Sequence, residues 1–267
     1  MATAAAFFDL DRTLISGASA FAFGVEAWRQ GMASRRDISR WAAGALNFLI
    51  TGDKGGDGNV DLRGEFLARI AEVSVADLDQ IGQTVVPKLV ARVRPESRKL
   101  VSMHHEAGRE TWIVSASPQG LVEPLAGALG MTGAIGTRGE VEDGRYTGRL
   151  DGPFIYGAGK AQAIEKLASD RGYDLKLSYA YSDSVSDLPM MELVGHPVAV
   201  NPDSELDRLA HERGWPIVIF ARRTKRAFAL SGAMVGTIGA ATVAYLIGRR
   251  HGRTAALAQV ARSTLEP

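Results

Sequence analysis

The sequence that decides the fold is Phe7-Phe8-Asp9-Leu10-Asp11-Arg12-Thr13, near the start of the chain. It closes an apolar run at residues 4–8, which is typical of a short buried strand. Because neighbours at i and i+2 point to the same side of an extended chain, we expect Asp9 and Asp11 to leave the strand together. Two carboxylates this close repel one another, so the pair needs a cation or a raised pKa. The pattern predicts a Mg²⁺ site, or a carboxylate nucleophile beside a carboxyl acid; two solvated acids are the plain alternative.

The composition limits the classes of protein to which the chain can belong. A length of 267 residues allows one large domain or two smaller ones. A net charge of +1 provides no overall field that would attract nucleic acid, so no nucleic-acid partner is expected. The absence of cysteine excludes disulfides and thiolate metal sites and suits a reducing compartment. No basic region followed by a long apolar stretch opens the chain, so no signal peptide is expected.

An uncharged stretch at residues 227–248 is long enough to cross a bilayer as a helix. Basic residues flank it on both sides: Arg222, Arg223, Lys225 and Arg226 before it, and Arg249, Arg250 and Arg253 after it. The stretch predicts a single C-terminal transmembrane helix followed by a basic tail at residues 249–267. A cytoplasmic catalytic domain anchored to the membrane is therefore expected. A terminal helix that packs on the globular part is the alternative.

The segment after the first strand is predicted to be helical. Apolar side chains recur at helical spacing through much of residues 18–94, interrupted by a glycine-rich loop at residues 52–58. Ser74 and Asp77 have the spacing of a capping box at the start of a helix. This block is predicted to be a small helical subdomain inserted into the rest of the fold.

From residue 95 onward, expected strands alternate with expected helices. Strands are expected at residues 111–114, 178–181, 197–200 and 216–220, and helices at residues 121–129 and 159–170. An Asp143-Gly144 pair predicts a hairpin between two short strands. The alternation predicts an α/β fold with a parallel sheet and helices on both faces. Asp9, Ser115 and Asp183 all fall at expected strand ends, which is the edge where such sheets bind ligands.

Four short motifs in this order resemble the haloacid dehalogenase-like superfamily, in its phosphoserine-phosphatase-like branch (subfamily IB). The segment from Asp9 to Thr13 stands as the first motif, Ser115 as the second, Lys160 as the third, and Asp183 with Asp187 as the fourth. The resemblance covers residues 4–221. It implies a Rossmann-like parallel core made of residues 1–15 and 95–221, with an all-helical cap inserted at residues 16–94.

The resemblance also implies catalytic and phosphate-binding roles. Asp9 would attack phosphorus and become an aspartyl phosphate, while Asp11 would protonate the leaving oxygen and then activate water. Ser115, the backbone N–H of Ala116 and the Lys160 ammonium would hold the phosphoryl oxygens.

A Mg²⁺ site is implied by the same motifs. Its ligands would be the carboxylates of Asp9 and Asp183 and the backbone carbonyl of Asp11, with water and substrate oxygen completing the octahedron. Asp187 would be a further ligand or would support the ligands from behind, and simple helix capping is its alternative.

The expected function is that of a Mg²⁺-dependent phosphomonoester phosphatase that acts through an aspartyl phosphate. Its expected substrate is a small phosphometabolite resembling phosphoserine, or a lipid phosphate. Departures from the phosphoserine phosphatase pattern are Ser184 and Ser186 in the fourth motif and Ala116-Ser117 in the second. Glu26 and Arg69 are loose matches for the cap residues that read the substrate. A catalytically silent protein that binds a phospho-ligand or acts as a membrane scaffold is the alternative, and transfer of the phosphoryl group to another acceptor is a third.

Overall fold

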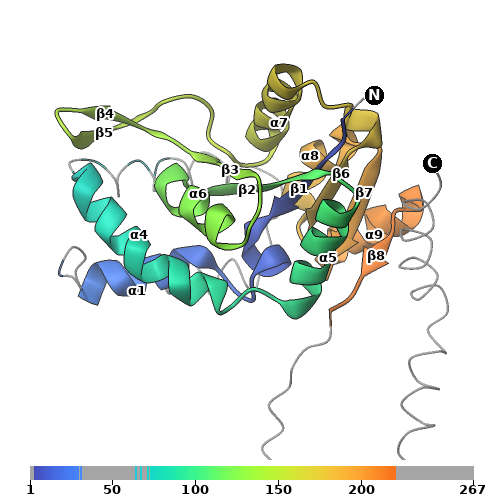
Figure 1. The fold of residues 1–267 in the computed structure, drawn as a ribbon, viewed down its shortest axis with the longest axis horizontal. Helices are drawn as coiled ribbons and strands as arrows, with labels where there is room; N and C mark the ends of the chain where they lie inside the picture. The colour runs from blue at the N-terminus through green and yellow to red at the C-terminus, as the bar shows by residue number, and fades with distance from the viewer. Residues whose placement is uncertain are drawn as a thin grey trace, which may run out of the picture.

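The computed structural model describes residues 3–29, 31, 64, 67, 71 and 73–220. At its centre is a six-stranded sheet in the order β3-β2-β1-β6-β7-β8, in which every neighbouring pair is parallel (Figure 1). The strands are β1 (Ala5–Asp9), β2 (Glu110–Pro118), β3 (Gly133–Thr137), β6 (Tyr179–Ser182), β7 (His196–Val200) and β8 (Ile217–Val218). The expected α/β class and parallel sheet are confirmed.

The apolar run at the start of the chain forms β1, which lies inside the sheet and is buried along its whole length. Its side chains alternate between two cores. Ala6 and Phe8 face a core shared with α5 (Pro95–Glu106) and α6 (Gln119–Ala128). Ala5 and Phe7 face a second core, whose helices are α7 (Ala158–Arg171), α8 (Leu188–Leu193) and α9 (Ser204–Arg213). A strand covered on both faces has no polar face to show, which explains the continuous apolar run.

The order of the strands reverses beside β1. From β1 the chain moves outward to β2 and β3, and it then returns to place β6 on the other side of β1. Open parallel sheets bind ligands at the carboxyl ends of the strands where this reversal occurs. Asp9 ends β1 and Asp183 directly follows β6, so both acids lie at that point.

Two helices of the expected cap, α1 (Ser19–Arg29) and α4 (Val75–Val90), lie side by side beyond the sheet (Figure 1). The segments that lead into and out of this insertion form a short antiparallel pair. Ile15 is bridged to Val93, the Ser16 N–H donates to the Arg92 C=O at 3.0 Å, and the Arg94 N–H donates to the Leu14 C=O at 3.0 Å. The insertion therefore leaves and rejoins the core at one place. Most of the expected cap, including the loop at residues 52–58, lies outside the described residues.

The expected Asp-Gly hairpin is confirmed as β4 (Gly139–Glu142) and β5 (Arg145–Leu150). Asp143 and Gly144 have φ values of 49° and 75°, the positive values that a two-residue turn of type I′ requires. The turn contacts the start of α4: the Val75 N–H donates to the Gly144 C=O at 3.0 Å, and the Tyr146 N–H donates to the Val73 C=O at 3.0 Å.

Two features of the sheet differ from the prediction. The sequence pattern did not predict β3, which contains two glycines in five residues and so lacks the composition of a strand. A side chain at Gly136 would come within 2.6 Å of Val122 and within 2.8 Å of the Gln119 backbone, so the close approach of α6 requires glycine there. The second difference is that β2 continues to Pro118, with an irregularity in its pairing after Val114.

The expected localisation, a catalytic domain anchored to a membrane, is corrected. In the part of the chain that the structure describes, no helix has both the length and the apolar character needed to cross a bilayer. The longest of these helices, α4, has 16 residues with charged side chains among them, whereas a bilayer needs about 20 apolar residues. The segment expected to span, residues 227–248, and the basic tail at residues 249–267 lie outside the described residues.

Candidate active site

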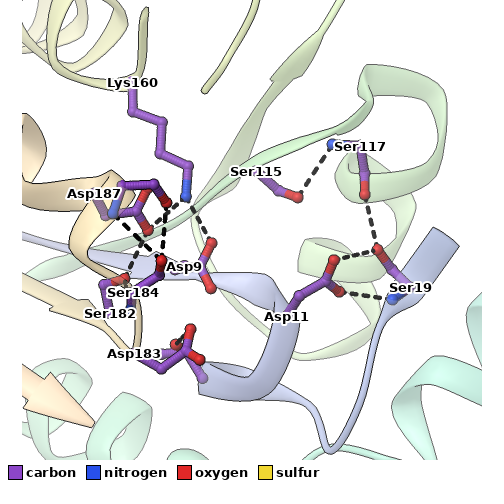
Figure 2. Close-up of polar contacts among 12 residues, drawn as sticks. Asp9, Asp11, Ser19, Ser115, Ser117, Lys160, Ser182, Asp183, Ser184 and Asp187 are labelled. Carbon is purple, nitrogen blue, oxygen red and sulfur yellow. Dashed lines mark hydrogen bonds and ion pairs between the residues drawn. The ribbon is translucent and has the colours of Figure 1, made fainter. Parts of the chain in front are cut away.

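A buried lysine joins two of the expected acids at the carboxyl edge of the sheet. The Lys160 Nζ lies 2.6 Å from Asp9 Oδ1 and 2.8 Å from Asp187 Oδ2 (Figure 2). Lys160 comes from the first turn of α7, and Asp187 ends the short helical turn η3 (Val185–Asp187) that follows β6. Asp187 also accepts a hydrogen bond from Ser182 Oγ at 2.7 Å. Its side chain makes no capping hydrogen bond to α8, so this geometry does not support the helix-capping alternative.

Burial and neighbouring charges determine the pKa values of Asp9 and Lys160. Burial raises the pKa of Asp9 to about 7; Lys160 opposes the rise, and the charges of Asp187 and Asp11 add to it. Burial lowers the pKa of Lys160, but the carboxylates of Asp187 and Asp9 outweigh this effect and the pKa is raised overall. Lys160 is therefore a permanent cation that favours the ionised form of Asp9.

Asp183 lies on the other side of Asp9, in the turn after β6, and is 3 % exposed. Its Oδ2 forms an ion pair with Arg12 Nε at 2.9 Å, and its Oδ1 accepts a hydrogen bond from Thr13 Oγ1 at 3.3 Å. Burial raises the pKa of Asp183 well above its usual value, the charge of Asp9 raises it further, and Arg12 lowers it. The pairing of Arg12 with Asp183 was not predicted from the sequence.

Asp11 points away from the lysine, into the start of the insertion. It lies in the wide turn η1 (Leu10–Leu14), which the Ile15 N–H closes by donating to the Leu10 C=O at 3.0 Å. The turn begins directly after Asp9, so Asp9 and Asp11 are not neighbours of one extended strand, and the expectation that they leave the strand together is wrong: Asp9 points to Lys160 and Asp11 to Ser19 (Figure 2). Asp11 Oδ1 accepts the Ser19 N–H at 2.7 Å and Oδ2 accepts the Ser19 hydroxyl at 3.0 Å (Figure 2). Burial raises the pKa of Asp11, and the two bonds from Ser19 lower it.

The second motif lies near the end of β2. Ser115 is buried, and its Oγ accepts the backbone N–H of Ser117 at 3.2 Å. Ala116 lies between the two serines and is partly exposed. Ser117 Oγ lies 2.9 Å from Ser19 Oγ, so the β2 end and the start of α1 are in direct contact. Ser19 and Ser117 were not predicted as site residues; the signals for them were a serine ahead of an apolar helical run and a hydroxyl at an expected glycine.

The donor set of this edge fits the implied Mg²⁺. Asp183 Oδ2 is buried, and none of the described residues donates a hydrogen bond to it; its contact with Arg12 is an ion pair without hydrogen-bond alignment. Among the described residues no three acidic or histidine side chains converge as a metal cage. Mg²⁺ does not need such a cage, because it is usually held by one or two carboxylates with water and substrate oxygens. Asp9, Asp183 and the Asp11 carbonyl remain the candidate ligands.

The loose expectations for substrate-reading residues in the cap have different outcomes. Glu26 is buried in α1, and its Oε2 lies 2.5 Å from Lys88 Nζ and 3.9 Å from Arg29 Nη1. Its charge is thus met by cations of the insertion itself. Arg69 lies outside the described residues.

Residues 6–192 match the family described as haloacid dehalogenase-like hydrolase, and the chain belongs to that family. Within it the chain is a phosphatase of the phosphoserine-phosphatase-like branch, as its relatives indicate. A Mycobacterium tuberculosis protein named phosphoserine phosphatase is 40% identical over 259 residues, which cover 94% of this chain and 82% of the relative. A Neisseria meningitidis protein named histidinol-phosphatase is 35% identical over 222 residues, covering 80% of this chain and 98% of the relative.

Among solved structures, a Bordetella pertussis protein of unknown function superposes with a TM-score of 0.70 at 28% identity. The superposition covers 82% of this chain and 99% of that one. This likeness shows that the chain shares its fold with that protein.

Proposed function

We propose that the chain is a Mg²⁺-dependent phosphatase of small phosphomonoesters that works through an aspartyl phosphate on Asp9. The observation that supports it is the position of Asp9, buried at the reversal point of the sheet between the Lys160 ammonium and the acid of the fourth motif. The same edge holds Asp11 and Ser115, so nucleophile, acid and phosphate-binding groups adjoin one another.

The first half-reaction forms an oxygen–phosphorus bond from Asp9 while the ester bond breaks. Lys160 engages Oδ1 of Asp9, so we assign Oδ2 as the attacking oxygen. Asp11 passes its proton to the departing alkoxide oxygen. Lys160 and Ser115, with the Ala116 N–H, hold the phosphoryl oxygens.

The second half-reaction releases phosphate from Asp9. Asp11, now a carboxylate, takes a proton from a water molecule whose oxygen attacks phosphorus, and the bond between phosphorus and Asp9 breaks. Mg²⁺, when bound by Asp9, Asp183 and the Asp11 carbonyl, supplies positive charge for the phosphoryl oxygens. Asp187 keeps Lys160 aimed at Asp9.

The names of two relatives define a common substrate chemistry. Phosphoserine and histidinol phosphate are both monoesters of a primary alcohol with an amine on the neighbouring carbon. We infer that the substrate of this chain is such a 2-aminoalkyl phosphate. Neither of these two names points to a lipid phosphate, the alternative substrate class.

Phosphate release from four esters tests this proposal: phosphoserine, histidinol phosphate, phosphoethanolamine and 3-phosphoglycerate. We expect turnover of the first two with Mg²⁺, weaker turnover of phosphoethanolamine, and little of 3-phosphoglycerate, which lacks the amine. Excess EDTA should abolish turnover, and added Mg²⁺ should restore it.

The matched variant is Asp9→Asn, which keeps the shape of the side chain but removes the nucleophilic charge. We expect its turnover to fall to background, and acid-quenched wild type, but not the variant, to retain radiolabelled phosphate. Substantial activity of Asp9→Asn, or efficient turnover of 3-phosphoglycerate alone, would overturn the proposal or its substrate class, respectively.

A further inference from the structure

Three side chains form a continuous hydrogen-bonded chain from Asp11 to the second motif. Ser19 Oγ lies 3.0 Å from Asp11 Oδ2 on one side and 2.9 Å from Ser117 Oγ on the other (Figure 2). The Ser117 backbone N–H then donates to Ser115 Oγ at 3.2 Å. The chain therefore links the expected acid and base to the segment expected to hold phosphate.

The direction of donation in this chain follows from the number of hydrogens. When Asp11 is ionised, its carboxylate only accepts, so Ser19 uses its one hydroxyl hydrogen on Asp11. Ser117 must then donate its own hydroxyl hydrogen to Ser19 Oγ. Both hydroxyls point their hydrogens toward Asp11, and each bond polarises the next in the same sense.

The chain also joins two parts of the fold that are far apart in sequence. Ser19 is the first residue of α1, is fully buried, and gives Asp11 both its hydroxyl and its backbone N–H. Ser117 belongs to β2 in the core. Asp11 is therefore held by two bonds from the insertion, one of which is supported from the core.

We propose that Ser19 and Ser117 are positioning residues that orient the Asp11 carboxylate for proton transfer. The inference rests on the proposed function and deepens it by assigning two further residues to the same site. Asp11 reaches its working direction only when the start of α1 and the end of β2 lie against each other.

The test compares kcat and KM for Ser117→Ala, Ser117→Thr and Ser19→Ala, with the best substrate of the panel. Because orientation of an acid acts on the chemical step, we expect kcat to fall about threefold in Ser117→Ala and about tenfold in Ser19→Ala, a modest part of the roughly 10²–10⁴-fold that acid–base catalysis contributes. KM should stay within about twofold, since neither hydroxyl is needed for ground-state binding. Ser117→Thr keeps a hydroxyl and should recover wild-type kcat.

The double variant Ser19→Ala/Ser117→Ala separates a connected chain from two independent contacts. If Ser117 acts only through Ser19, the double variant should lose no more kcat than Ser19→Ala alone. Ser16→Ala is the matched control, because Ser16 lies in the same linker but places its hydroxyl on the Arg92 C=O. Its kcat should equal that of the wild type.

A wild-type kcat in Ser117→Ala, multiplicative losses in the double variant, or a change in KM alone would each overturn the inference. Thermal unfolding of each variant shows whether its fold is retained. If Ser19→Ala proves unstable, the kcat of Ser117→Ala decides the test, because that substitution leaves α1 intact. If the serine variants keep wild-type kcat while Asp9→Asn is inactive, this inference is overturned and the proposed function stands. An active Asp9→Asn overturns the proposed function and the inference together.

Discussion

Lys160 is a single side chain on which the charge balance of the site depends. It is 3 % exposed and contacts two carboxylates, Asp9 and Asp187, that would otherwise lie buried without a cation. A buried ion pair that loses one partner leaves a charge without solvent or counterion, which costs far more than the loss of a surface pair. Lys160 is therefore expected to contribute to stability as well as to activity.

We predict that Lys160→Met lowers the free energy of unfolding by about 3 kcal/mol or more, since both acids lose their counterion. The matched control is Lys166→Met on the same helix, whose exposed pair with Asp170 should contribute about 0.5 kcal/mol or less. Urea unfolding measures both. Equal small losses in the two variants would show that Asp9 and Asp187 do not depend on Lys160.

Asp9, Ser115 and Asp183 could be named from the sequence because each falls at an expected strand end, whereas Lys160 and Asp187 were named from the family resemblance. Asp9, Lys160 and Asp187 are indeed brought into contact by the structure. Arg12 and Ser19 were not predicted as partners of Asp183 and Ser117, because neither the local pattern nor the family motifs assign those contacts. Such contacts depend on the path of the whole fold, which no local pattern encodes.

At the scale of secondary-structure elements, the β4–β5 hairpin is attached to the first turn of α4. The two backbone bonds of the hairpin turn flank Ser74, whose Oγ accepts the Asp77 N–H at 3.0 Å as the capping pattern predicted. A cap residue satisfies a backbone donor that the helix itself leaves unpaired. Loss of this cap should therefore loosen both α4 and its attachment to the hairpin.

We predict that Ser74→Ala destabilises the start of α4 by about 1 kcal/mol. Hydrogen exchange of the Val75, Ala76 and Asp77 amides should accelerate about fivefold, the rate equivalent of that energy. Ser74→Asp is the control, because aspartate is an equally good cap and should leave exchange near the wild-type rate. Unchanged exchange in Ser74→Ala would mean that the hairpin alone fixes this turn.

The predicted strands β1 and β6 differ in composition from β3, which was not predicted, and packing explains the difference. β1 and β6 carry the apolar side chains that two covered faces demand, so their sequences are typical of strands. β3 has glycine at positions 133 and 136, where a side chain would clash with Trp112 and with α6, respectively. Whether these five residues form a strand depends on the elements packed against them, and the five residues alone do not reveal those neighbours.

For the molecule as a whole, a neutral histidine between α5 and the sheet affects stability against acid. Arg109 Nε donates to His104 Nδ1 at 2.8 Å, so Nε2 carries the hydrogen and donates to Tyr181 OH at 2.7 Å. Burial lowers the pKa of His104 to about 3, with Arg109 and His105 adding to the effect. The unfolded chain binds a proton near pH 6.5, where the folded protein does not.

We predict that acid below pH 6.5 therefore favours the unfolded state through His104. Relative to His104→Gln, which cannot titrate, the wild type should lose about 1.4 kcal/mol of unfolding free energy per pH unit as pH falls from 6 toward 4. Urea unfolding of both proteins at several pH values gives the difference and cancels the titration of the acids. A constant difference over that range would contradict the neutral state of His104.

The paired segments at Ile15 and Val93 have a consequence for how this architecture can diversify. Because the incoming and outgoing chain are hydrogen-bonded neighbours, the distance between their ends does not depend on what lies between them. Inserts of different length and content can be exchanged at this junction while β1, β2 and the acids they carry keep their path. Substrate range can thus change by replacement of a module, provided that the new module keeps the two hydrogen bonds that Ser19 gives to Asp11.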